Sequence, residues 1–147
     1  MTLSIQRVPG SFAAEVFGVD LRRTLGVDEI ARIEAALDRH AVLVFRDQRI
    51  SDEQQIKFTL RFGAIENAAG GNVTKPYQRR LDMRINDVSN LDEHNAPLAR
   101  DDRRRMFNLG NRLWHSDSSY RVVPARYSLL SARELPDAGG NTEFADM

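Results

Sequence analysis

The chain has 147 residues, about the length of one domain, and its 21 Lys and Arg balance its 21 Asp and Glu. A net charge of zero gives no overall field that favours nucleic acid or an anionic membrane as a partner. Cysteine is absent, which excludes disulfides and thiolate metal sites, and no apolar run reaches membrane-spanning length, so we expect a cytoplasmic protein.

The N-terminal part predicts two strands, a helix and a third strand. Ser4–Val8 and Ala13–Val19 have the composition of short strands, and Pro9-Gly10 between them is a turn signal. Asp28–Arg39 carries apolar residues at helical spacing. The continuous apolar run Ala41–Phe45 is typical of a buried strand.

A second helix and a loop are predicted next. Ser51-Asp52-Glu53-Gln54 is a capping-box pattern, which predicts a helix that ends at Gly63. Residues 64–78 lose periodicity and contain Ala68-Ala69-Gly70-Gly71, a composition that predicts a loop with the character of a lid. Strand-like alternation returns at Leu81–Val88.

The remaining elements predict strands rather than helices. Residues 91–105 are polar and irregular, whereas Arg126–Ala132 and Thr142–Phe144 predict strands on either side of a turn at Pro136–Asn141. Because helices gather in the first half and strands in the second, we expect an α+β architecture that builds an antiparallel barrel or jelly roll.

The segment Trp114-His115-Ser116-Asp117-Ser118 carries the strongest chemical signal. In an extended segment, residues two apart point to the same side, so the His115 imidazole and the Asp117 carboxylate converge on one ion. Such a pair suits a non-haem Fe(II) centre that takes a second histidine as its third ligand. The pattern also permits a turn aspartate and a histidine satisfied by backbone. Trp114 points opposite to His115 in an extended segment, so we expect it in the core.

Neither of the other histidines is well placed as the third ligand. His40 ends a helix just before an apolar strand, where capping or packing is the expected role, and His94 lies in a polar loop that we expect to be solvated. The chain stops at Met147 without a closing element. We therefore expect a truncated chain.

Three blocks of sequence resemble the taurine/alpha-ketoglutarate-dependent dioxygenase family, most closely its 2,4-dichlorophenoxyacetate branch. They are Leu113–Tyr120, Ala125–Ala132 and Gly139–Met147, and Val16–Leu21 and Val42–Arg46 add to the likeness upstream. The resemblance spans the whole chain but only about the first half of a family member.

The resemblance implies a double-stranded β-helix (jelly roll, cupin-like) of which this chain is the N-terminal portion. It implies Fe(II) bound by His115, Asp117 and a distal histidine, with 2-oxoglutarate and O₂ as co-substrates. The distal histidine, and an arginine that holds 2-oxoglutarate, are implied beyond Met147. Thr142 matches a position whose hydroxyl contacts 2-oxoglutarate, although it also has the propensity to open a strand.

Three further residues match positions near the primary substrate. They are Asn111, Tyr120 and Lys75, the last of which would pair with a substrate carboxylate. Asn111 capping a turn and Tyr120 in the core stay open as alternatives.

The implied reaction is hydroxylation of a small carboxylate such as an aryloxyacetate. Hydroxylation beside the ether oxygen gives a hemiacetal that collapses to a phenol and glyoxylate, with release of succinate and CO₂. The alternatives are a related oxygenase acting on taurine or another sulfonate or sulfate ester, a metal-dependent hydrolase, and a catalytically incompetent fragment. The partners implied are small molecules, and a homo-oligomer stays open for the full-length protein.

Overall fold

A computed structural model describes residues 2–67 and 73–147. The chain forms two compact units: unit 1 combines Met1–Gly63 with Leu130–Met147, and unit 2 is Ala64–Leu129. Of the loop predicted at residues 64–78, residues 68–72 lie outside the described residues, and Pro76–Gln78 form a single helical turn. Among the helices of the described ranges, none has the length and apolar character needed to cross a membrane.

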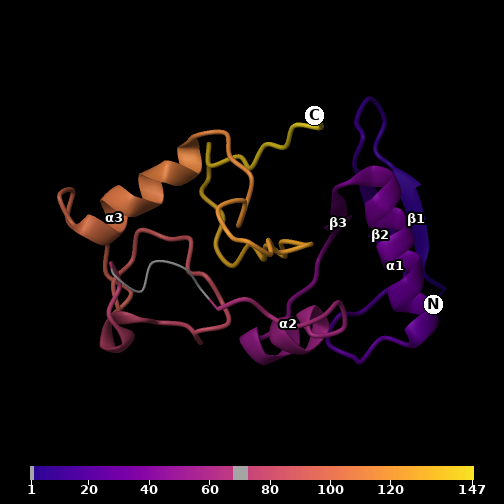
Figure 1. The fold of residues 1–147 in the computed structure, drawn as a ribbon, viewed down its shortest axis with the longest axis horizontal. Helices are drawn as coiled ribbons and strands as arrows, with labels where there is room; N and C mark the ends of the chain where they lie inside the picture. Colours follow the sequence, from indigo (N-terminus) through magenta and orange to yellow (C-terminus); the bar gives the residue numbers. More distant parts are fainter. Residues whose placement is uncertain (1, 68–72) are drawn as a thin grey trace. The chain divides into compact units, whose positions relative to one another are not determined.

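Unit 1 contains a three-stranded mixed sheet in the order β1-β2-β3 (Figure 1). β1 (Ser4–Arg7) pairs antiparallel with β2 (Ala14–Phe17), and β2 pairs parallel with β3 (Leu43–Phe45). All three predicted N-terminal strands are present in shortened form. The third is half-buried rather than fully buried, because it lies at the edge of the sheet.

The parallel connection from β2 to β3 contains α1 (Val27–His40), which lies alongside the strands (Figure 1). The predicted helix is confirmed and is one residue longer at each end. It buries Ile30 and Ile33, while Arg32 donates a hydrogen bond to the Leu3 carbonyl at 2.8 Å. The other buried apolar side chains of unit 1 are Leu3, Ala14, Val16, Leu21, Leu25, Ala36, Ile50, Ile56 and Phe58.

The second predicted helix is α2 (Asp52–Thr59), and it begins where the capping box predicts. Ser51 Oγ accepts the Gln54 backbone N–H at 3.3 Å, and Gln54 Oε1 accepts the Ser51 N–H at 2.8 Å. The helix ends at Thr59 rather than Gly63, since residues 60–63 form turns and bends.

Arg133 ties the C-terminal segment of unit 1 to the start of α2. Its Nη2 donates to Asp52 Oδ1 at 2.9 Å and to Gln55 Oε1 at 2.8 Å, and its Nη1 donates to the Ile50 carbonyl. Three contacts from one guanidinium therefore hold residues 130–147 against a helix formed far earlier in the chain.

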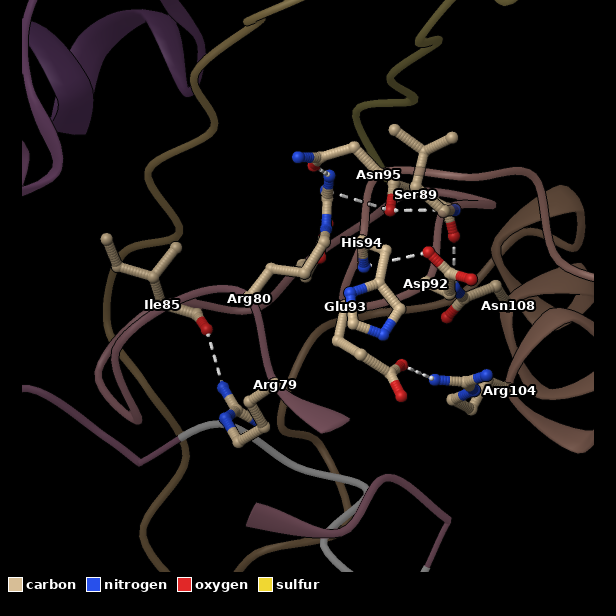
Figure 2. A network of polar contacts seen from close by, with 12 residues as sticks. Arg79, Arg80, Ile85, Ser89, Asp92, Glu93, His94, Asn95, Arg104 and Asn108 are labelled. Carbon is tan, nitrogen blue, oxygen red and sulfur yellow. Dashed lines mark hydrogen bonds and ion pairs between the residues drawn. The ribbon is translucent and has the colours of Figure 1, made fainter. Parts of the chain in front are cut away.

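Unit 2 contains η1 (Pro76–Gln78), α3 (Arg103–Asn108) and η2 (Leu109–Arg112), joined by irregular segments. Arginine–carboxylate pairs organise these segments (Figure 2). Arg80 pairs with Asp87, and Arg104 bridges Glu93 and Asp102 at 2.9 Å each. Its one buried apolar side chain among the described residues is Leu98.

The strands predicted for the second half of the chain are wrong. Leu81–Val88, Arg126–Ala132 and Thr142–Phe144 form bends and irregular backbone, and the three strands of the described residues all lie before residue 46. A strand needs a neighbour to pair its backbone groups, and these segments have none here. The α+β class holds, but the small mixed sheet is not itself a jelly roll.

Candidate metal centre

Two consecutive short helices, α3 and η2, directly precede the candidate centre in the chain. α3 starts at Asp102, whose carboxylate accepts the Arg104 backbone N–H at 2.8 Å, and η2 follows directly. At Leu113 the backbone becomes extended. This change brings His115 and Asp117 to the same side, as the spacing of two residues predicts.

The His115 ring faces a carbonyl with one nitrogen and a carboxylate with the other. Nδ1 lies 2.7 Å from the Leu113 carbonyl oxygen, and Nε2 lies 3.3 Å from Asp117 Oδ1. Because a carbonyl only accepts, Nδ1 carries the hydrogen in that contact. In the neutral ring Nε2 then presents a lone pair to Asp117, the arrangement in which a metal ion is bound by both groups, whereas a protonated ring donates its Nε2 hydrogen to Asp117 in an ion pair.

The separation of these two atoms suits shared coordination. Imidazole and carboxylate donors bind divalent metals at about 2.1 Å, so two ligands at right angles on one ion lie about 3 Å apart. The 3.3 Å between His115 Nε2 and Asp117 Oδ1 is close to that value. The pair therefore fits a divalent metal, and the Nδ1 contact is the kind of second hydrogen bond that orients ligand histidines.

The second oxygen of Asp117 is already occupied. Ser128 donates its hydroxyl hydrogen to Asp117 Oδ2 at 2.7 Å. Ser128 lies within one of the blocks that carry the family resemblance, but the sequence alone gave it no role. Ser128 and Asp117 are 11 residues apart, and no local sequence pattern predicts that they meet, so the contact is found only in the folded chain.

The segment after Asp117 is a turn fixed by Glu66. Ser118 has a φ of 55°, in the left-handed region that non-glycine residues rarely adopt. Its hydroxyl donates to Glu66 Oε2 at 2.9 Å, and Arg121 forms an ion pair with the same carboxylate. Asp117 itself lies in this turn, and its carboxylate contacts His115 and Ser128. Glu66 is a second supporting residue that the sequence did not indicate.

Comparison with known proteins places the chain in a family. The model of the taurine catabolism dioxygenase TauD, TfdA family matches residues 4–147. The chain belongs to the TauD/TfdA family.

Its relatives include alpha-ketoglutarate-dependent dioxygenases. The chain is 44% identical over 139 residues to the alpha-ketoglutarate-dependent 2,4-dichlorophenoxyacetate dioxygenase of Cupriavidus pinatubonensis, covering 92% of this chain and 47% of that protein. It is 37% identical to the (S)-phenoxypropionate/alpha-ketoglutarate-dioxygenase of Delftia acidovorans, covering 99% and 47%. The chain thus spans about half the length of these relatives.

A solved structure is similar as well. The crystal structure of AAD-2 in complex with Mn(II) and N-oxalylglycine is 52% identical, with a TM-score of 0.77 over 85% of this chain and 43% of that chain. The fold of this TauD/TfdA chain therefore matches the corresponding part of a family member.

The other residues predicted for the TauD/TfdA site are exposed. Lys75 precedes η1, and its backbone N–H donates to Gln78 Oε1 at 3.1 Å. Asn111 lies within η2, and Tyr120 is 72% exposed, with Arg121 stacked over its ring at 5.6 Å from the centroid. Tyr120 is therefore not a core residue here. Trp114, which we expected in the core, is 70% exposed.

Thr142 lies in unit 1, in exposed backbone without strand structure. The Gly139-Gly140 turn before it is confirmed, because both residues have left-handed φ angles of 75° and 70°. A Cβ at Gly140 would also meet the Pro136 ring at 3.0 Å. Glycine is therefore required for the turn that precedes Thr142.

The other two histidines each have contacts of their own. His40 Nδ1 faces the Phe12 carbonyl at 3.3 Å within unit 1. His94 is exposed in a turn where Asp92 accepts its backbone N–H at 2.9 Å (Figure 2). Within residues 2–67 and 73–147, no group of three histidine, cysteine or carboxylate side chains is arranged to hold a metal.

A small cavity in unit 2 is separate from the His115–Asp117 pair. It has a volume of about 80 Å³ and includes Arg79, Arg80 and Arg104 in its lining. Arg79 Nη2 donates to the Ile85 carbonyl at 2.9 Å, whereas its buried Nε has no hydrogen-bond partner (Figure 2). None of the predicted site residues lines this cavity in the described part of the chain.

Proposed function

We propose that the protein is an Fe(II)- and 2-oxoglutarate-dependent dioxygenase that cleaves the ether of an aryloxyalkanoate. The observation that carries this proposal is the facing pair of His115 Nε2 and Asp117 Oδ1, held at the spacing of ligands on one ion. Membership of the TauD/TfdA family and the phenoxyalkanoate substrates in the names of its relatives support the substrate class.

Residues 1–147 then form the N-terminal portion of a single jelly-roll domain. The share of each relative that the chain covers supports this assignment. The third metal ligand, a histidine, and the arginine for 2-oxoglutarate belong to the remaining portion of the domain. Thr142 would contact 2-oxoglutarate.

The residues of this chain have distinct tasks in the reaction. His115 presents a bare Nε2 because the Leu113 carbonyl holds the hydrogen on Nδ1, and Asp117 balances charge without supplying a proton. Iron, 2-oxoglutarate and O₂ supply oxidative decarboxylation and the hydroxylation of a substrate carbon when bound. The protein's part is orientation and exclusion of water.

Lys75, Asn111 and Tyr120 would bind the primary substrate. The ammonium group of Lys75 pairs with the carboxylate and holds the carbon beside the ether oxygen toward the centre. Hydroxylation of that carbon gives a hemiacetal, whose collapse passes the bonding electrons to the aryl oxygen and releases a phenol and glyoxylate. A sulfonate would satisfy Lys75 equally, so taurine-type substrates are the competing class.

The first test is metal binding, read from Trp114. This residue is the one tryptophan of the chain and directly precedes His115, so a paramagnetic metal at the centre quenches its fluorescence. We expect saturable quenching by Mn(II) under anaerobic conditions, weakened at least tenfold in His115→Ala. His94→Ala is the matched control and should bind as the unaltered chain does. Equal quenching in the His115→Ala chain would refute the metal site.

The substrate class has its own test in the complete domain. Phenol release from aryloxyacetates and sulfite release from taurine, each measured with 2-oxoglutarate, separate the two classes. Lys75→Ala should raise KM for the aryloxyacetate more than it lowers kcat, because the proposed ion pair is made before the chemical step.

A further inference from the structure

We infer that Ser128 is a positioning residue for the metal centre, one that holds Asp117 so that a single carboxylate oxygen faces His115. This inference rests on the proposed function. It assigns a role to the Tyr127-Ser128 part of the second sequence block, which has none in the reaction described above.

The contacts around Asp117 divide its two oxygens between different partners. Oδ2 accepts the Ser128 hydroxyl at 2.7 Å, and Oδ1 lies 3.3 Å from His115 Nε2. The Ser128 contact has the usual length for a hydroxyl donor, and its carboxylate acceptor makes it a charge-assisted bond. Oδ2 is therefore hydrogen-bonded within the protein, and Oδ1 is the oxygen that can bind the metal ion.

Exposure makes this restraint necessary. The Asp117 side chain is 58% exposed, so packing does not fix the rotation of its carboxylate. Rotation about the terminal bond of an aspartate is broad and roughly two-fold, and an unrestrained carboxylate exchanges its oxygens. The hydroxyl of Ser128 restricts this rotation and disfavours chelation through both oxygens.

The His115 ring is restrained in the same manner. Its Nδ1 is held by the Leu113 carbonyl, so each of the two ligands has one atom bound to protein and one atom directed at the other ligand. Such outer contacts around metal ligands contribute about ten- to hundredfold to metal affinity or activity. Because the Ser128 bond is exposed, we expect the lower end of that range.

The test compares Ser128→Thr with Ser128→Val, two side chains of equal shape that differ by the hydroxyl. Mn(II) affinity is measured by quenching of Trp114 fluorescence, and the electron paramagnetic resonance spectrum of bound Mn(II) reports its coordination. We expect Ser128→Thr to bind like the unaltered chain, and Ser128→Val and Ser128→Ala to bind about tenfold more weakly with an altered spectrum.

The control is Ser131→Ala, which removes a hydroxyl three residues away that makes no hydrogen bond in the described structure. Thermal unfolding of every variant separates lost binding from lost folding, and the Thr–Val pair decides the matter if Ser128→Ala does not fold. Equal affinity in the Thr and Val variants overturns the inference. If His115→Ala also leaves binding unchanged, the proposed metal site fails as well; if His115→Ala abolishes binding, only the role of Ser128 fails.

Discussion

Glu29 shows how one carboxylate at the start of a helix couples stability to pH. It accepts hydrogen bonds from Arg23 Nη1 at 2.9 Å and from the Gly26 backbone N–H at 2.8 Å. These bonds, that of the Arg23 side chain foremost, lower the pKa of Glu29 from 4.5 to about 2. The Glu29 carboxylate therefore stays ionised in the folded state at pH values where the same group binds a proton in the unfolded state.

A depressed folded pKa stabilises the protein above pH 4.5, and this contribution is lost as the pH falls toward 2. We expect the urea midpoint to fall between pH 6 and pH 3, and to fall less in Glu29→Gln. Asp28→Asn is the matched control, because Asp28 shares the first turn of α1 but makes neither of these bonds. An identical pH dependence in Glu29→Gln and the unaltered chain would contradict the assignment.

For single residues, the sequence predicts the pair of candidate metal ligands but not the side chains that hold them in place. The pairing of His115 with Asp117 follows from a local rule, since they are two positions apart and the backbone becomes extended at Leu113. Ser128 and Glu66 reach the same segment from 11 and 52 residues away, to Asp117 and Ser118 respectively. Such contacts depend on the tertiary fold, which no spacing rule contains.

Among the elements, α2 depends on its capping box. Ser51 and Gln54 satisfy each other's backbone N–H groups, and a short helix gains little from propensity alone. We expect Ser51→Ala to lower the free energy of unfolding by about 1 kcal/mol, and Ser51→Asp to retain most of it. Urea unfolding followed by circular dichroism measures the difference. No loss in Ser51→Ala would show that the cap contributes nothing, and a loss in Ser51→Asp as large as that in Ser51→Ala would show that a carboxylate does not replace the hydroxyl.

The elements that sequence predicts correctly are those with local signals. α2 is fixed by its cap, and the first hairpin by Pro9-Gly10, where Gly10 has a φ of 72°. The strands predicted at Leu81–Val88 and Arg126–Ala132 rest on composition, and β propensity mainly reflects packing against neighbours. Without neighbouring strands, those segments have no reason to extend.

For the whole molecule, the distribution of apolar surface predicts self-association. Unit 1 has a core, whereas Val122 and Val123 of unit 2 are 102% and 81% exposed. Adjacent exposed apolar side chains favour contact with another surface. We expect the apparent mass in light scattering to rise with protein concentration, and the rise to diminish in a Val122→Ser, Val123→Ser double variant.

Val27→Ser serves as the control for that experiment, because Val27 is 76% exposed at the start of α1 and lies in the unit that has a core. It should associate like the unaltered chain. A constant monomer mass over the concentration range would refute the expectation, and an equal decrease in both variants would place the contact elsewhere.

Because Arg133 follows α2 in the chain, its hydrogen bonds to the start of α2 form only late in synthesis on the ribosome. Arg133 and Asp52 are 81 residues apart. At a synthesis rate of about 5–20 residues per second, several seconds pass between the emergence of α2 and that of its arginine partner. Closing so long a loop also costs chain entropy that a short hairpin does not. Until then the nascent α2 has its capping box and its contacts with earlier residues but no arginine partner, and unit 1 is completed only after the whole of unit 2 has been made.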